Sequence, residues 1–172
     1  YKVEDREYLI GALLQQFDTG QIHNFDWGNR QILEKLDHPA LGEQLRPYIT
    51  DISRKFEARH FAIELAELCE VRALQDNLVG VALNSAEHIT LRVDAAYAVV
   101  SICDIATRAK LKPLIYADTD PNDELKGCGL MAVWPETMAI NEILPLLIPP
   151  QKDNFVGLYR FFWVIGLSEI YL

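Results

Sequence analysis

The sequence lacks the features by which membrane, exported and disulfide-stabilised proteins are recognised. No apolar run reaches the roughly 18 residues that a membrane-spanning helix needs, and the longest candidate, 161–167, is far shorter. No basic segment followed by an apolar stretch marks a signal peptide. The cysteines are odd in number and show no CxxC spacing, and they are Cys69, Cys103 and Cys128. We therefore expect a cytoplasmic protein whose thiols fill its core, with no membrane contact.

Basic residues are also scarce, with 16 lysines and arginines against 25 acidic residues and a formal net charge of −9. Proteins that bind nucleic acids usually present a basic stripe to the phosphate backbone. The acidic balance therefore argues against DNA or RNA as the main partner and against anionic membranes. It leaves a local basic groove open.

The common catalytic and cofactor-binding motifs are absent. The sequence contains no Gly-x-x-x-x-Gly-Lys-Ser/Thr loop, no Gly-x-Ser-x-Gly elbow and no His-Glu-x-x-His. The histidines share no metal-ligand spacing and are expected in loops or on the surface, and they are His23, His38, His60 and His88. Segment 118–124 has the alternating oxygens of a calcium loop, but Asp123 replaces the required glycine and Gly129 the bidentate glutamate. We expect no catalytic residue, metal or cofactor in this chain.

What the sequence does contain is an internal repeat. The segment Leu-Arg-Pro-Tyr-Ile at 45–49 is matched by Leu-Lys-Pro-Leu-Ile at 111–115. Related segments begin at steps of 33 residues, with Leu45, Leu78, Leu111 and Leu144. A second series lies between them, in which a small residue follows a basic one after three places. Its basic members are Arg59, Arg92 and Lys126, and its small members are Ala62, Ala95 and Gly129. Each unit thus holds two segments, A and B.

Both segments have the pattern of helices. In the second B segment, apolar residues fall on one helical face at Leu91, Ala95, Val99 and Ile102, and further apolar residues cover other faces. Such a helix is buried on several sides, as an inner helix between neighbouring units would be. The small residues would let these helices approach closely. The sequence therefore predicts an all-α fold of about four helix pairs.

Prolines and acidic residues punctuate the predicted helices. Pro39 and Pro121 suit first helical turns, while Trp134-Pro135 and Pro149-Pro150 should end the third B and fourth A helices. Capping and first-turn carboxylates or amides precede the third B helix at Asp120, Asn122, Asp123 and Glu124. Prolines inside the A segments should kink them, and they are Pro47, Pro113 and Pro145.

A helix pair of this length, with proline in A and Arg-x-x-Ala-Ala in B at 92–96, resembles the HEAT-repeat family over residues 39–162. The tetratricopeptide and ankyrin signatures are not matched. The resemblance implies an α–α superhelix, a HEAT/armadillo-like solenoid, over 39–172. Residues 1–38 are less regular and are interpreted as a degenerate repeat or connector, with one helix from Val3 to Phe17 stopped near Gly20.

A narrower resemblance covers the third and fourth units. Residues 120–127, Leu130, 134–135, 144–150 and 154–159 resemble the helical region of large bacterial NACHT or STAND-type P-loop NTPases, which often serve in defence against phage. The nucleotide-binding motif itself does not occur in this sequence. The chain starts at Tyr1 and ends on the apolar stretch 161–172, from which we expect a piece cut from a longer protein. A free chain that begins at a processed tyrosine is the alternative.

The three basic residues of the B segments form the candidate binding feature. In stacked repeats, Arg59, Arg92 and Lys126 would make a ladder along one face. Either each pairs with a carboxylate between repeats, such as Asp94 or Glu64, or together they form a cationic stripe for an acidic partner.

The leading hypothesis is a non-enzymatic recognition or scaffold segment. It would bind a protein partner or other domains of the same chain, and it could form oligomers through its apolar C-terminal end. An enzyme on a HEAT scaffold, such as a HEAT-like DNA glycosylase, is the alternative and would need a basic concave groove. A free-standing adaptor is the third possibility.

Overall fold

The fold is all-α. The computed structural model describes residues 2–23, 30–117, 119–152 and 157–166, and no strand occurs in these ranges. The helices of the first half are α1 (Val3–Thr19), α2 (Arg30–Leu33) with η2 (Glu34–Leu36), α3 (Leu41–Thr50), α4 (Phe56–Leu68), and η3 (Arg72–Leu74) with α5 (Gln75–Leu83). Those of the second half are α6 (Ile89–Ile102), α7 (Ile105–Arg108) with η4 (Ala109–Tyr116), α8 (Glu124–Val133), α9 (Ile140–Ile143) with η5 (Leu144–Leu146), and α10 (Leu158–Phe161) with η6 (Phe162–Gly166).

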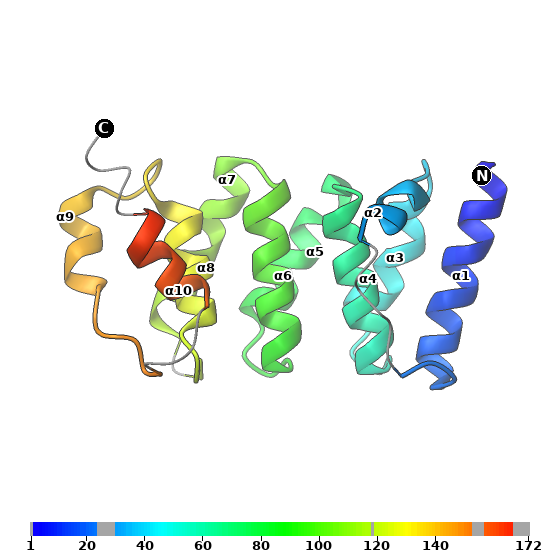
Figure 1. The fold of residues 1–172 in the computed structure, drawn as a ribbon, viewed down its shortest axis with the longest axis horizontal. Coiled ribbons are helices and arrows are strands. Elements are labelled where there is room, and N and C mark those ends of the chain that lie inside the picture. Colours follow the sequence, from blue (N-terminus) through cyan, green and yellow to red (C-terminus); the bar gives the residue numbers. More distant parts are fainter. Residues whose placement is uncertain (1, 24–29, 118, 153–156, 167–172) are drawn as a thin grey trace.

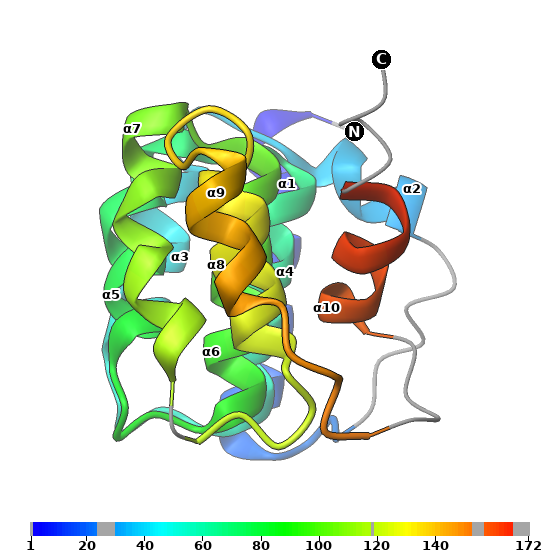
Figure 2. The same cartoon turned by 90° about the vertical axis from the view of Figure 1, so that its left-hand side faces the viewer.

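The elements from α1 to α9 follow one another along the long axis of the molecule, whereas α10 turns back to lie beside α8 (Figure 1). Seen end-on, α3, α5 and α7 form one layer and α4, α6 and α8 a second layer beside it (Figure 2). Neighbours within each layer touch, and each A element packs on the B helix of its own unit. Three successive helix pairs are thus present as the repeat predicted.

The fourth pair departs from this arrangement. Its B element, α10, packs against α8 on the side of the second layer that faces away from the first (Figure 2). Gly127 of α8 permits this close approach, because a Cβ there would meet the backbone nitrogen of Tyr159 and lie 2.6 Å from the carbonyl carbon of Leu158. On another side of α8, a Cβ at Gly129 would lie 2.9 Å from the backbone nitrogen of Ile115 in η4.

The prolines of the A segments shorten or tighten these helices. Around Pro113 the segment is a 3-10 helix over Ala109–Tyr116, and Pro145 lies in the 3-10 turn η5. A proline removes one amide donor and crowds the carbonyl four residues before it, so the α-helical ladder does not continue through these positions. In α3, by contrast, Pro47 is accommodated within an α-helix of 10 residues.

Several helix boundaries differ from those expected. The helix α3 begins at Leu41 and α8 at Glu124, so Pro39 and Pro121 lie in the preceding turns rather than in the first helical turns. The prediction that α8 ends at 134–135 is confirmed, because its last residue is Val133. The fourth A segment ends at Leu146, before the two prolines.

The N-terminal helix behaves as a member of the second layer. Its range matches the expected helix, and Gly20 closes it with φ of 74°, a left-handed conformation that glycine adopts without strain. It packs on α4, where the rings of Phe17 and Phe61 have centroids 5.0 Å apart. A short helical segment, α2 followed by η2, leads from the N-terminal helix toward α3.

One apolar core runs from α1 to α8, and a smaller one joins α8 to the C-terminal elements. The B helices are buried on several faces, as α6 illustrates with Leu91, Ala95, Ala98 and Val99. No helix of the described residues is both long enough and apolar enough to cross a membrane.

Candidate functional site

The first two basic residues of the predicted ladder serve the ends of helices. Arg59 Nη2 donates a hydrogen bond to the carbonyl oxygen of Ile49 at 3.2 Å, and Arg92 Nε donates to that of Ala82 at 3.2 Å. Each acceptor lies ten residues earlier, in the last turn of the A helix of the same unit. The last carbonyls of a helix have no partner within it, so each arginine satisfies one of them.

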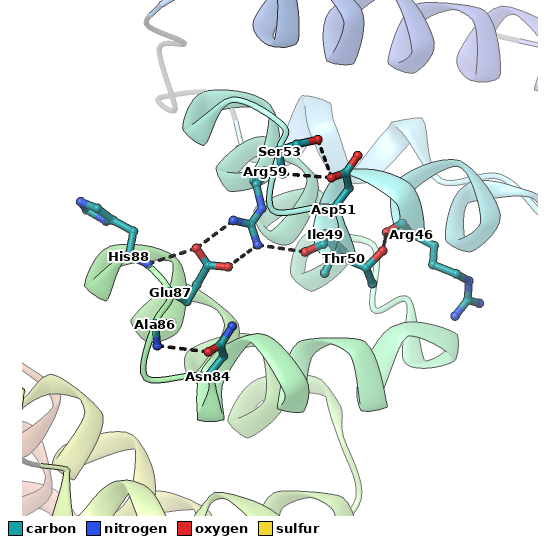
Figure 3. A network of polar contacts seen from close by, with 10 residues as sticks. All are labelled: Arg46, Ile49, Thr50, Asp51, Ser53, Arg59, Asn84, Ala86, Glu87 and His88. Atoms are coloured by element: carbon teal, nitrogen blue, oxygen red, sulfur yellow. Dashed lines mark hydrogen bonds and ion pairs between the residues drawn. The ribbon is translucent and has the colours of Figure 1, made fainter.

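Both arginines also reach the loop of the following unit. Arg59 binds the carboxylate of Glu87 with two hydrogen bonds of 2.8 and 2.5 Å (Figure 3), which lower the pKa of Glu87. Arg92 Nη1 donates to Thr119 Oγ1 at 3.4 Å. The two arginines are only 4% and 5% exposed, so their charges lie inside the molecule rather than along its surface.

The third member of the ladder, Lys126, makes a different contact. Its Nζ lies 4.6 Å from the centroid of the Tyr159 ring in α10, a cation–π geometry. The carboxylate between repeats is therefore Glu87, which forms an ion pair with Arg59, whereas Asp94 and Glu64 lie beside His60. Because both guanidinium groups are buried, Arg59 and Arg92 do not present a cationic stripe on the surface.

A groove lies on the other side of the second layer, between α4, α6 and α8 and under α10. It consists of two adjoining hollows of about 620 and 470 Å³, which share the side chains of Val93, Tyr97, Glu124 and Leu158. The larger hollow is also lined by Ile89, Met131, Phe161 and the loop from Asp120 to Asn122. The smaller one is also lined by His60, Ile63, Glu64, Glu67 and Asp94.

The groove follows the repeat. Residues one place after the ladder position are His60 and Val93, and residues five places after it are Glu64, Tyr97 and Met131. Positions four apart share a helical face, so these residues form a continuous strip across the three B helices. The sequence contains this signal, because His60, Glu64, Val93, Tyr97 and Met131 stand at fixed places after the basic residue of their unit.

The electrostatics of the smaller hollow centre on one histidine. His60 Nδ1 lies 2.8 Å from Asp94 Oδ2 and His60 Nε2 lies 3.8 Å from Glu64 Oε2. The hydrogen bond to Asp94 raises the pKa of His60, and burial opposes it. The ring of Phe56 stacks on the imidazole at 5.7 Å.

The expectation that the histidines lie in loops or on the surface was wrong for His60, whereas His38 does lie in the loop before α3. His60 lies half-buried on α4, and His38 is buried with its Nε2 3.0 Å from Gln44 Oε1. Neither position could be told from the sequence, because their polar partners come from other elements.

The acidic loop before α8 holds that helix and the chain beyond it. Asp120 Oδ2 accepts from the backbone N–H of Lys126 at 2.9 Å and thereby caps α8, whereas Asp123, at the expected cap position, has φ of 59° and no side-chain cap bond. Asp123 instead accepts from the backbone N–H of Gln151 at 2.7 Å. Glu124 Oε2 accepts from Leu158 N at 3.3 Å and so ties α10 to α8.

Three side-chain oxygens between Asp120 and Glu124 accept no hydrogen bond from the residues that the structure describes. They are Asp120 Oδ1, Asn122 Oδ1 and Glu124 Oε1, all buried beside the larger hollow. Burial raises the pKa of Asp120 and of Glu124, and hydrogen bonds from backbone amides act the other way. Within the described ranges, no group of three His, Cys, Asp or Glu side chains is arranged to hold a metal ion.

No protein-family model matches the sequence, and neither the curated proteins nor the solved structures gave a significant match.

Proposed function

We propose that this chain is a HEAT-type segment, a HEAT/armadillo-like α–α superhelix that binds a protein and does not catalyse a reaction. The partner would be another protein or another domain of the same chain. The observation that carries the proposal is the groove, whose lining recurs at the same places in successive units. Superhelical repeat proteins bind partners along such continuous faces.

We further propose that the parent protein is a large bacterial NACHT or STAND-type NTPase of the cytoplasm, with a role in defence against phage. The support is the sequence resemblance of the third and fourth units. The loop 120–124 belongs to this resemblance, and its carboxylates tie α8 to the segments around Gln151 and Leu158. A P-loop domain in the full-length gene product would support this parentage, and its absence would favour a free-standing adaptor.

A DNA glycosylase-like enzyme is not favoured by the groove. Such an enzyme needs a basic cleft for the phosphate backbone, whereas Glu64, Glu67 and Asp94 line this one. We expect no binding of a labelled DNA duplex at an ionic strength of about 0.15 M, measured by fluorescence anisotropy. Saturable binding would reinstate the enzyme as a candidate.

A photo-crosslinking experiment tests the binding face. A photoreactive phenylalanine analogue replaces Tyr97 in the groove or, as the control, Tyr116 on the first layer, both exposed. In the full-length protein we expect position 97 to crosslink to one defined segment, mapped by mass spectrometry, and position 116 to give no such product. Equal products at both positions, or none at 97, would contradict the proposed face.

A further inference from the structure

The two hollows of the groove differ in chemistry. The larger one is mostly apolar, with walls from Ile89, Val93 and Leu158, and the buried oxygens without donors lie at its edge. The smaller one is lined by the acidic side chains of α4 and α6. Their volumes of about 620 and 470 Å³ fall in the range of about 300–1,000 Å³ that ligand sites occupy. An occupant of both would need an apolar stem and more than one positive charge.

The charge of the groove is negative. Glu64, Glu67, Asp94 and Glu124 contribute carboxylates, and His60 is the one basic side chain among the described residues that line the groove. These groups are partly shielded from water, which strengthens their attraction for a cation relative to bulk solvent. Anionic peptides and nucleic acids would be repelled.

The unpartnered oxygens give an independent indication of a ligand. Asp120 is only 5% exposed and lines the larger hollow, yet its Oδ1 accepts no hydrogen bond from any described residue. The buried oxygens Asn122 Oδ1 and Glu124 Oε1 likewise have no donor in the described part of the chain. Buried acceptors are nearly always hydrogen-bonded in folded proteins. A guanidinium group carries five N–H donors in one plane and can serve several acceptors together.

We propose that the groove binds an arginine-bearing peptide segment, with one arginine in the larger hollow and a second basic residue against the acidic wall of the smaller one. The stem of the first arginine packs between Val93 and Leu158, and its head turns toward Asp120, Asn122 and Glu124. Arginine combines an apolar stem with a charged head in this way. This inference rests on the proposed binding function and specifies the partner's chemistry.

Binding of three labelled peptides tests the inference. They share one length and one leucine-flanked pattern and carry two arginines, two lysines or two citrullines, the last being neutral isosteres of arginine. Fluorescence anisotropy at an ionic strength of about 0.15 M measures their affinities. We expect saturable binding of the arginine peptide, several-fold weaker binding of the lysine peptide, and at least tenfold weaker binding of the citrulline peptide. Equal affinities, or no saturable binding of the arginine peptide, would overturn the inference.

Variants of the chain locate the binding. We expect Glu64→Gln/Glu67→Gln to weaken binding of the arginine peptide at least tenfold. We expect Asn122→Ala, tested separately, to weaken it several-fold. The matched control, Glu43→Gln/Asp76→Asn, removes two exposed charges from the first layer and should leave the affinity unchanged. Unchanged melting temperatures verify folding, and amide shifts of Val93 and Tyr97 report the site directly. An equal loss in the control, or shifts confined to other elements, would contradict the site.

The outcomes also separate this inference from the proposed function. If position 97 crosslinks in the full-length protein but the peptides bind without regard to arginine, the binding face stands and its arginine specificity falls. If neither result is obtained, both fall. If an acidic peptide binds as well as the arginine peptide, the charge argument is wrong.

Discussion

The two central units, α3–α4 and α5–α6, and the C-terminal region of α8 and α10 differ in the contacts that the basic residue of the repeat makes. In the central units, buried Arg59 and Arg92 each join the end of one helix to the loop of the next unit. In the C-terminal region, Lys126 of α8 lies over the ring of Tyr159, and α10 packs against α8 at Gly127, where no Cβ is in the way. The repeat therefore determines where a positive charge lies, while the neighbouring element determines what that charge contacts.

The comparison is tested most severely by removing the buried arginines. Arg59→Met should reduce the free energy of unfolding by about 3–5 kcal/mol, because it leaves the buried carboxylate of Glu87 without its partner. Arg92→Met should cost less, about 1–3 kcal/mol, because Arg92 makes hydrogen bonds but forms no ion pair with a described residue. Urea unfolding followed by circular dichroism measures both.

The double variant Arg59→Met/Glu87→Leu is the control. It removes both charges and should recover much of the loss, because no buried charge is left unpaired. An equal cost for the two single variants, or no recovery in the double variant, would show that the ion pair does not distinguish these units.

The glycines give the next largest contrast. Gly127→Ala should destabilise by about 1–3 kcal/mol, because the new Cβ collides with the backbone of α10. Gly80→Ala, in α5 of the central units, has open space around its Cβ and should stabilise by about 0.5–1 kcal/mol. Unfolding curves and hydrogen exchange of the α10 amides distinguish the two. A Gly127→Ala protein with unchanged exchange in α10 would contradict the observed packing.

A smaller effect is expected from the ion pair between α4 and α6. The hydrogen bond to Asp94 raises the pKa of His60 above the ordinary histidine value of about 6.5. The pair therefore stabilises the fold fully below about pH 6.5, and this contribution is lost as the pH rises through the folded pKa. His60→Gln should reduce the free energy of unfolding by less than about 1 kcal/mol in acid and leave it unchanged in mild alkali. The melting temperature, measured at both pH values, checks this.

Asp94→Asn should give the same pH dependence as His60→Gln, since either change removes the pair. In α8 the position that corresponds to His60, one place after the basic residue, is Gly127, which has no titratable side chain. A His60→Gln effect that stays constant from acid to alkali would show that the imidazole contributes by packing alone.

The thiols provide a comparison without any change in stability. Cys103 is partly exposed, whereas Cys128 is buried in α8 and burial raises its pKa strongly. Burial also raises the pKa of Cys69 to about 12. An alkylating reagent should modify Cys103 first, Cys69 more slowly, and Cys128 only on unfolding, as followed by mass spectrometry. In Gly127→Ala, faster modification of Cys128 would indicate that α10 has lifted.

The sequence predicted the helical units well, because their packing depends on local patterns. The buried positions Leu45, Leu78 and Leu111 recur every 33 residues, and each lies fully inside the core. The fourth member, Leu144, is 56% exposed, since no further described helix covers it. A pattern of apolar residues identifies a face that can be buried, but it does not identify the element that buries it.

The groove was harder to predict, because its geometry depends on contacts distant in the sequence. Asp94 meets His60 across 34 residues, and Glu124 meets the Leu158 amide across 34 residues. The shift of α10 onto the outer side of α8 creates the larger hollow, and the periodic sequence gives no sign of this shift. The acidic loop was noticed as a failed calcium site, whereas its role in holding α8 and α10 together required the structure.

The double contact of Arg59 has a consequence for cooperativity. A row of packed units can be described by an intrinsic term for each unit and a coupling term for each boundary. One guanidinium group contributes to both terms, because it completes its own helix pair through Ile49 and joins the next through Glu87. Substitution of Arg59 should therefore convert a single unfolding transition into two. The broadening of that transition would measure how far one part of the molecule senses the folding of another.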